Sequence, residues 1–135
     1  MSARRLSTRT VTQQEAASYF RKAREFHETM NAEYGNGRWN SAALAGVHCA
    51  ISAADAVLGK TAGIRSAGDS HADATQLLRL RVSHGETPRQ AQRLLRILRD
   101  KNAVEYESRE FTAAEAADMV KAVGRFWTWA QTFFL

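Results

Sequence analysis

The chain has 135 residues, of which 44% are hydrophobic and 24% are charged, and its net charge is +5. This length is that of one domain with a buried core, and eight glycines and one proline leave few turns for a β-sandwich. The single cysteine, Cys49, excludes an internal disulfide, and the sequence has no Cys/His pattern at metal-ligand spacing, so we expect neither a metal nor a cofactor.

The N-terminal segment differs from the rest of the chain. Residues 1–11 predict a disordered basic arm, and residues 12–135 predict one all-α domain, an up-and-down bundle of four to five helices. The arm lacks the apolar stretch of a secretory signal. We find no apolar run that is long enough to span a membrane. These features predict a soluble, cytoplasmic protein.

Two long helices are predicted first. Thr12 and Glu15 form a capping-box pattern that starts a helix ending at residues 35–37. A second helix is predicted from about Arg38 to Leu58, ended by Gly59. It is apolar over most of its circumference, which indicates a central place in a bundle or a subunit interface.

A narrow polar stripe interrupts that apolar surface. It consists of Ser41, His48, Ser52 and Asp55, at spacings of seven, four and three residues. One interpretation is the solvent-exposed edge of the helix. The other is a polar groove beside a functional site or along a dimer seam.

The fourth predicted helix follows a loop over residues 60–69 and a short third helix. Thr87 as N-cap and Pro88 in the first turn mark its start. A leucine stripe faces the core, and arginines occupy the opposite side: Arg89, Arg93, Arg96 and Arg99. The segment from Arg79 to Lys101 has seven basic and two acidic residues, and seven minus two is +5, the net charge of the whole chain.

This localised charge favours phosphate as a ligand. The residues predicted to contact the phosphates of a nucleic acid are Arg89, Arg93, Arg96, Arg99 and Lys101. The alternative is a solvated face whose cations pair with acids of a neighbouring molecule. A capping-box pattern, Thr112 with Glu115, also starts the last predicted helix, and the spacing of its aromatic residues indicates core or dimer contacts.

Several segments together carry a resemblance: the Ala-rich AISAADAVLG, the Ser83-His84 pair, the basic helix leading into RDKNAVEYE, and the turn REFTAAEA. The chain resembles a HEPN domain, an all-α family of prokaryotic toxin–antitoxin and defence systems. The resemblance implies a homodimer in which two Arg-x4–6-His motifs line one RNA-cleaving cleft. In the branch that pairs with minimal nucleotidyltransferases, the motif is Arg, four residues, His, any residue, Tyr.

The chain departs from this motif at one position. Arg99 matches the arginine, Asp100 the polar residue after it and Tyr106 the tyrosine, but Val104 replaces the histidine. Valine cannot transfer a proton, and losing a general acid–base typically costs about 10²–10⁴-fold in rate. We therefore expect an RNA- or nucleotide-associated homodimer with weak or no ribonuclease activity.

Two alternatives stay open. A histidine from elsewhere could supply the missing group, and the candidates are His71, which follows Arg65 at motif-like spacing, and His48. The chain would then be an active, metal-independent endoribonuclease toxin. Alternatively, the domain would be a non-catalytic module that docks a nucleotidyltransferase or another defence protein, with Tyr106 as the residue that such a partner modifies.

Overall fold

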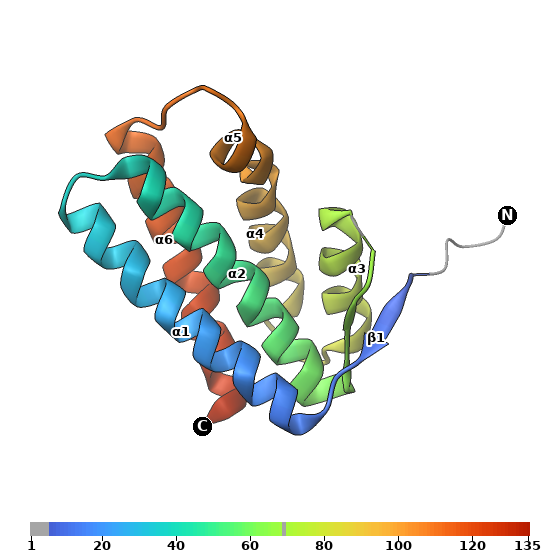
Figure 1. The fold of residues 1–135 in the computed structure, drawn as a ribbon. Helices are drawn as coiled ribbons and strands as arrows, with labels where there is room; N and C mark the ends of the chain where they lie inside the picture. Colours follow the sequence, from blue (N-terminus) through green and yellow to red (C-terminus); the bar gives the residue numbers. More distant parts are fainter. Residues whose placement is uncertain (1–5, 69) are drawn as a thin grey trace, which may run out of the picture.

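The structure, a computed structural model, describes residues 6–68 and 70–135 and confirms the all-α fold class. Its elements are β1 (Thr8–Thr10), α1 (Gln13–Gly35), α2 (Trp39–Ala62), β2 (Ile64–Ser66), α3 (His71–Arg81), α4 (Thr87–Arg99), α5 (Lys101–Tyr106), α6 (Ala113–Gln131) and a 3₁₀ turn, η1 (Thr132–Phe134). Helices α1 and α2 form an antiparallel hairpin, α6 packs against both, and α3 and α4 close the other side (Figure 1).

Two predicted capping boxes form at the N-termini of the long helices α1 and α6. The backbone N–H of Glu15 donates to Thr12 Oγ1 over 3.1 Å, and the N–H of Thr12 donates to Glu15 Oε1 over 3.0 Å. Thr112 and Glu115 repeat the arrangement with the same distances at the start of α6. Each box satisfies N–H groups that the first turn of a helix leaves without partners.

Helix α2 is the centre of the core and is longer than predicted. It continues past Gly59 to Ala62 and ends at Gly63, whose φ of +67° gives the left-handed C-cap that glycine favours. Gly59 lies inside the helix because the chain packs closely there: a methyl group on it would lie 2.6 Å from Val11 Cγ1 and 3.0 Å from Ala16 Cβ. This glycine serves packing, so taking it as a helix end was wrong.

The same helix corrects the expectation that no apolar run could span a membrane. Over its 24 residues α2 is long and apolar enough to do so by length and composition. However, 78% of the apolar window is buried inside the bundle, where α1 and α6 cover it. The apolar surface of α2 is therefore used for the core.

The predicted disordered arm over residues 1–11 is wrong for residues 8–10. These form β1, which pairs antiparallel with β2 so that Thr8 lies opposite Ser66 and Thr10 opposite Ile64. Val11 follows the strand and is 4% exposed, so it anchors the ribbon to the core. Residues 1–5 of the arm lie outside the described residues.

Residues 87–106 form two helices, α4 and α5. Helix α4 ends at Arg99, Asp100 caps it, and α5 then begins at Lys101. The N-cap of α4 is Glu86, one residue earlier than predicted.

The aromatic residues of α6 lie in the core as expected, with Phe126 fully buried and Trp127 and Trp129 each 4% exposed.

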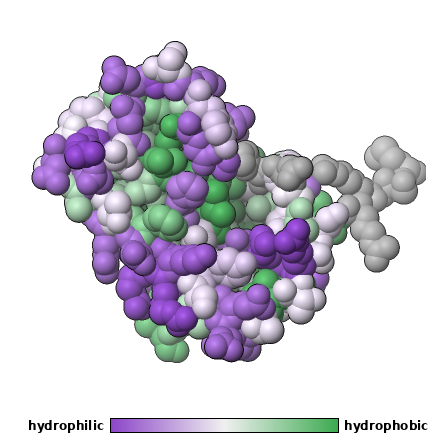
Figure 2. All heavy atoms as spheres, in the orientation of Figure 1, coloured by the Kyte–Doolittle hydropathy of each residue, from purple (hydrophilic) through white to green (hydrophobic). Residues whose placement is uncertain are grey.

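One face of the molecule shows hydrophobic side chains in a furrow along α2, surrounded by hydrophilic ones (Figure 2). Leu44 is 36% exposed on this helix, and Ile51 and Asp55 are half-buried. His48 lies between them with a side chain that is 40% exposed. The polar stripe of α2 is therefore an edge of the helix that keeps partial contact with solvent, although Ser52 is buried.

Candidate functional site

Helix α4 presents the arginine stripe, which consists of Arg89, Arg93, Arg96 and Arg99. Ala91, Leu94, Ile97 and Leu98 on the opposite side are buried, so packing fixes which way the helix faces. Arg89, Arg96 and Arg99 are exposed and Arg93 is half-buried. Together with Gln92, the four arginines line a shallow hollow on the outer face of α4. The predicted stripe thus comes together in the structure.

Lys101 lies apart from the arginine stripe. Its Nζ is 2.9 Å from Glu105 Oε2, and only 22% of its side chain is exposed. It lines a different niche, between α2, β2 and α4, together with Asp55 and Arg65. Of the five predicted RNA-contacting residues, the structure therefore groups four.

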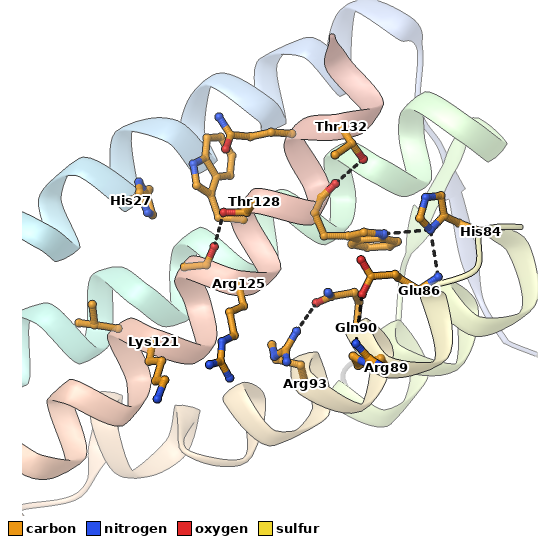
Figure 3. Close-up of a pocket in the computed structure, with 15 residues that line it drawn as sticks. His27, His84, Glu86, Arg89, Gln90, Arg93, Lys121, Arg125, Thr128 and Thr132 are labelled. Atoms are coloured by element: carbon orange, nitrogen blue, oxygen red, sulfur yellow. Dashed lines mark hydrogen bonds and ion pairs between the residues drawn. The ribbon is translucent and has the colours of Figure 1, made fainter.

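The stripe also borders a broad, open groove of about 1150 Å³ between α4 and α6. This α4–α6 groove is lined by Arg89, Arg93 and Gln90 from α4, by Lys121, Gly124, Arg125 and Thr128 from α6, and by His84 and Glu86 from the turn before α4, among others. The side chains of Arg93 and Arg125 extend into the space between the two helices (Figure 3). Sequence reasoning missed Lys121 and Arg125, because it treated α6 only as a core helix.

Positive charge is concentrated in this groove with little acidic compensation. Burial lowers the pKa of Arg93, followed by repulsion from Arg125 and Arg89, while Glu86 opposes the shift. Arginine stays charged despite such a shift. Within the described part of the chain, Arg96, Arg99, Lys121 and Arg125 form no ion pair. The groove therefore offers cations whose partners must come from elsewhere.

His84 is held in one tautomer at the end of the groove. Its Nδ1 accepts hydrogen bonds from the backbone N–H of Glu86 over 3.0 Å and from the indole N–H of Trp129 over 3.3 Å. A nitrogen that accepts twice carries no proton, so the proton of the neutral ring is on Nε2. His84 is therefore left with Nε2–H as a donor, and Figure 3 shows its two hydrogen bonds at Nδ1.

The motif residues lie where α4 meets α5. Arg99 is the last residue of α4, Asp100 caps it, and both are exposed. Val104 is half-buried and packs against the hydrophobic core, and its N–H donates to Asp100 O over 3.0 Å. Tyr106 is 77% exposed. The motif position that would carry a proton is therefore filled by an aliphatic packing residue.

Glu105 connects α5 to α2. It accepts from Lys101 Nζ over 2.9 Å, and its Oε1 lies 3.6 Å from His48 Nε2. The pKa of Glu105 is lowered mainly by the hydrogen bond from Lys101, with smaller contributions from a Tyr106 hydrogen bond and from His48. We call Lys101, Glu105, Tyr106 and His48 the α5 corner.

The two candidate replacement histidines have different settings. His48 lies beside the motif helix through its contact with Glu105, and its ring centroid is 5.4 Å from that of Phe26. His71 is the first residue of α3, and its side chain lies outside the described residues. The structure thus brings His48 to the motif helix.

A family comparison assigns the chain. No curated protein matches it in sequence. The model of the HEPN domain matches residues 16–133, which cover both long helices, the arginine stripe and the α5 corner. The all-α bundle agrees with that match, and a HEPN domain indicates a function related to RNA or nucleotides. The chain belongs to the HEPN domain family.

Proposed function

We propose that this chain is a homodimeric, cytoplasmic RNA-associated protein of the prokaryotic defence type, with a degenerate motif and little or no ribonuclease activity. Its cleft would form around Arg96, Arg99 and Tyr106 and be completed by a second copy. The observation that carries the proposal is the combination at the end of α4. Arg96 and Arg99, which form no ion pair with any residue that the structure describes, lie beside a motif whose histidine position holds Val104.

The cations support binding. RNA backbone phosphates are the natural partners of arginines that are not bound in an ion pair, since a guanidinium matches phosphate oxygens in a bidentate arrangement. The partly exposed apolar side chains along α2, Leu44 and Ile51, support pairing with a second copy, because exposed apolar patches commonly mark interfaces.

The absent histidine argues against cutting. Cleavage of RNA by its own 2′-hydroxyl needs a base, an acid and a cation at the pentavalent phosphorus. Arg99 supplies a cation, but the aliphatic side chain of Val104 supplies neither of the other two. A protein with the arginines and without the proton carrier would hold RNA rather than cut it.

The test is a binding titration with single-stranded RNA at several salt concentrations. Affinity should fall steeply with salt, because bound phosphates release counterions. An Arg96→Ala/Arg99→Ala double variant should bind weakly, whereas Arg21→Ala/Lys22→Ala, which removes two charges from exposed positions of α1, should bind like the parent. Equal affinity of the Arg96/Arg99 variant and the parent would refute the cleft.

An active ribonuclease is the second candidate, and the position of His48 favours it. With Nε2 3.6 Å from Glu105, His48 lies beside the motif helix and could supply a proton carrier. The parent would then cleave structured RNA in the presence of EDTA. His48→Ala should abolish the cleavage and His71→Ala should leave it, whereas the absence of any cleavage by the parent removes this candidate.

A docking module for a nucleotidyltransferase is the third candidate, favoured by the exposure of Tyr106. Its side chain is 77% exposed, so an enzyme could reach the phenol. Mass spectrometry after co-expression with such a partner should find a nucleotidyl adduct on Tyr106. Its absence from the peptide that contains Tyr106 would eliminate this candidate.

A further inference from the structure

The α4–α6 groove is distinct from the cleft proposed around Arg96, Arg99 and Tyr106. Arg96 also faces a second hollow that contains Asp100, Glu115 and Asp118. None of these residues lines the groove, which runs along α6 from Val120 to Thr132 and reaches His84.

The floor of the groove is formed by residues at every fourth position, Val120, Gly124 and Thr128 of α6 and Thr132 at the start of η1. At a rise of 1.5 Å per residue this row is about 18 Å long. A Cβ on Gly124 would meet nothing within 4 Å, so the floor is open above this residue. A ligand could thus come close to the helix backbone at the middle of the row.

Cations line one side of this floor. Arg89 and Arg93 come from α4, and Lys121 and Arg125 come from α6 at positions adjacent to Val120 and Gly124. Figure 3 shows Arg93, Arg125 and Lys121 extending into the same space. The one carboxylate that lines the groove, among the described residues, is Glu86, whose Oε1 is 3.7 Å from Arg89 Nη1. The net positive charge on this side of the groove suits a polyanionic ligand.

The hydroxyl groups of the floor are set to accept. Thr128 Oγ1 donates to Gly124 O over 2.9 Å within α6, and Thr132 Oγ1 of η1 donates to Trp129 O over 2.6 Å. Since each hydroxyl has only one proton, its remaining lone pairs can only accept from a ligand. A ribose 2′-hydroxyl is a donor of this kind, and deoxyribose has none.

We propose that the α4–α6 groove binds one strand of RNA, with its phosphates on Arg89, Arg93, Lys121 and Arg125 and its ribose 2′-hydroxyls on Thr128 and Thr132. This site rests on the proposed function, because it takes the same ligand, and it adds a second contact surface beside the motif. Trp127 and Trp129 are each 4% exposed, so bases have no free indole to stack on. Recognition is therefore by backbone and sugar and is independent of sequence.

The test measures binding of a fluorescein-labelled uridine homopolymer about 12 nucleotides long, within the usual range of roughly 4–16 for single-strand sites. Gly124→Gln fills the open floor without changing charge. It should weaken binding by about tenfold or more, the equivalent of one lost hydrogen bond to a charged group. Gly35→Gln is the matched control, because a Cβ at Gly35 also meets nothing within 4 Å and the residue ends α1.

Charge and sugar recognition are tested separately. Arg93→Gln/Arg125→Gln should reduce the slope of log affinity against log salt by about 1.4, since each single-strand phosphate contact contributes roughly 0.7. The parent should bind the uridine homopolymer more tightly than the deoxyuridine homopolymer. Thr128→Val/Thr132→Val, which removes the accepting oxygens, should reduce that preference.

The outcomes separate this site from the cleft. If Gly124→Gln binds as tightly as Gly35→Gln, the groove site is wrong, even where Arg96→Ala/Arg99→Ala weakens binding and the proposed function stands. If Gly124→Gln alone weakens binding, the groove stands and the cleft around Arg96 is refuted. A parent that binds no RNA overturns both. Loss of dimer mass in Gly124→Gln by light scattering would identify the groove as an interface between copies and overturn the RNA site.

Discussion

The α4–α6 groove and the α5 corner lie at the two ends of α4 and differ in whether their cations form ion pairs. In the groove, Lys121 and Arg125 have no ion-pair partner within the described residues. In the corner, Lys101 is bound to Glu105 over 2.9 Å and little of either side chain is exposed, 22% and 12%. Charges satisfied inside the protein hold the fold, and charges left open are available to a ligand.

This difference divides the work between the two regions. An open cation cluster suits binding of a phosphate chain, whereas the paired corner fixes the position of α5 and of the motif residues on it. On the two proposals above, the corner would set whether chemistry takes place, and the groove would set how strongly RNA is held. The predictions below change one region at a time.

The largest effect is expected from Val104→His, which restores the motif in the corner. A general acid–base returned to its position should raise the rate of RNA cleavage by about 10²–10⁴-fold over the parent, measured with structured RNA in the presence of EDTA. Val104→Gln is the matched control, since it is polar but cannot carry a proton at neutral pH. If Val104→His binds RNA yet cleaves no faster than Val104→Gln, the loss of activity does not rest on this residue alone.

Asp55, in the niche behind the corner, should give the next largest effect. Burial raises the pKa of its carboxyl from 3.8 to about 6, with Arg65 opposing the shift. The folded chain thus holds the proton more tightly than the unfolded chain. Ionisation of Asp55 therefore lowers the free energy of unfolding. This loss is absent below about pH 4 and grows as the pH rises through 6, to about 3 kcal/mol at most.

Asp55→Asn removes that cost. Its free energy of unfolding, relative to the parent, should therefore be more favourable at pH 8 than at pH 4, as measured by urea denaturation at both values. Arg65 and Lys101 line the same niche, so their attraction for the carboxylate reduces the difference. A stability difference that is the same at both pH values would show that Asp55 ionises as in the unfolded chain.

The sequence predicted the parts of this fold that local patterns specify. Capping boxes at Thr12 and Thr112 and the helical spacing of apolar residues located α1 and α6, because these signals are local. The paired strands β1 and β2 were missed, since three residues each carry no periodic signal and their pairing joins residues about 56 positions apart. The end of α2 was misplaced because a packing glycine and a capping glycine look alike in sequence.

Only part of the candidate site could be predicted from the sequence, for a similar reason. The arginine stripe lies on one helix, so its spacing revealed it. Lys121 and Arg125 join it from α6, and only the packing of α6 against α4 brings them there. The same holds for His48 and Glu105, which come from different helices. Tertiary contacts decide which charges are open and which are paired, and single-helix patterns do not record them.

A smaller effect is expected from Glu105→Gln in the corner. The hydrogen bond from Lys101 holds the pKa of Glu105 below its ordinary value of 4.5, so the stabilisation is present above that pH and is lost as the pH falls through the folded pKa. At pH 7 the variant should lose about 1–2 kcal/mol of unfolding free energy, as measured by thermal or urea unfolding. The loss should shrink below pH 4, and an equal loss at both pH values would mean that packing rather than charge is responsible.

The smallest effect is expected at Gly124, in the open floor of the groove. Glycine inside a helix costs about 0.5–1 kcal/mol relative to alanine, and nothing lies within 4 Å of the added Cβ, so Gly124→Ala should stabilise the protein by that amount in urea denaturation. Gly59→Ala is the contrasting variant, because its Cβ would lie 2.6 Å from Val11 Cγ1, and it should destabilise. If Gly124→Ala is less stable than the parent, the fold requires a glycine at this position. Keeping the floor open for RNA would then not be the reason for this glycine.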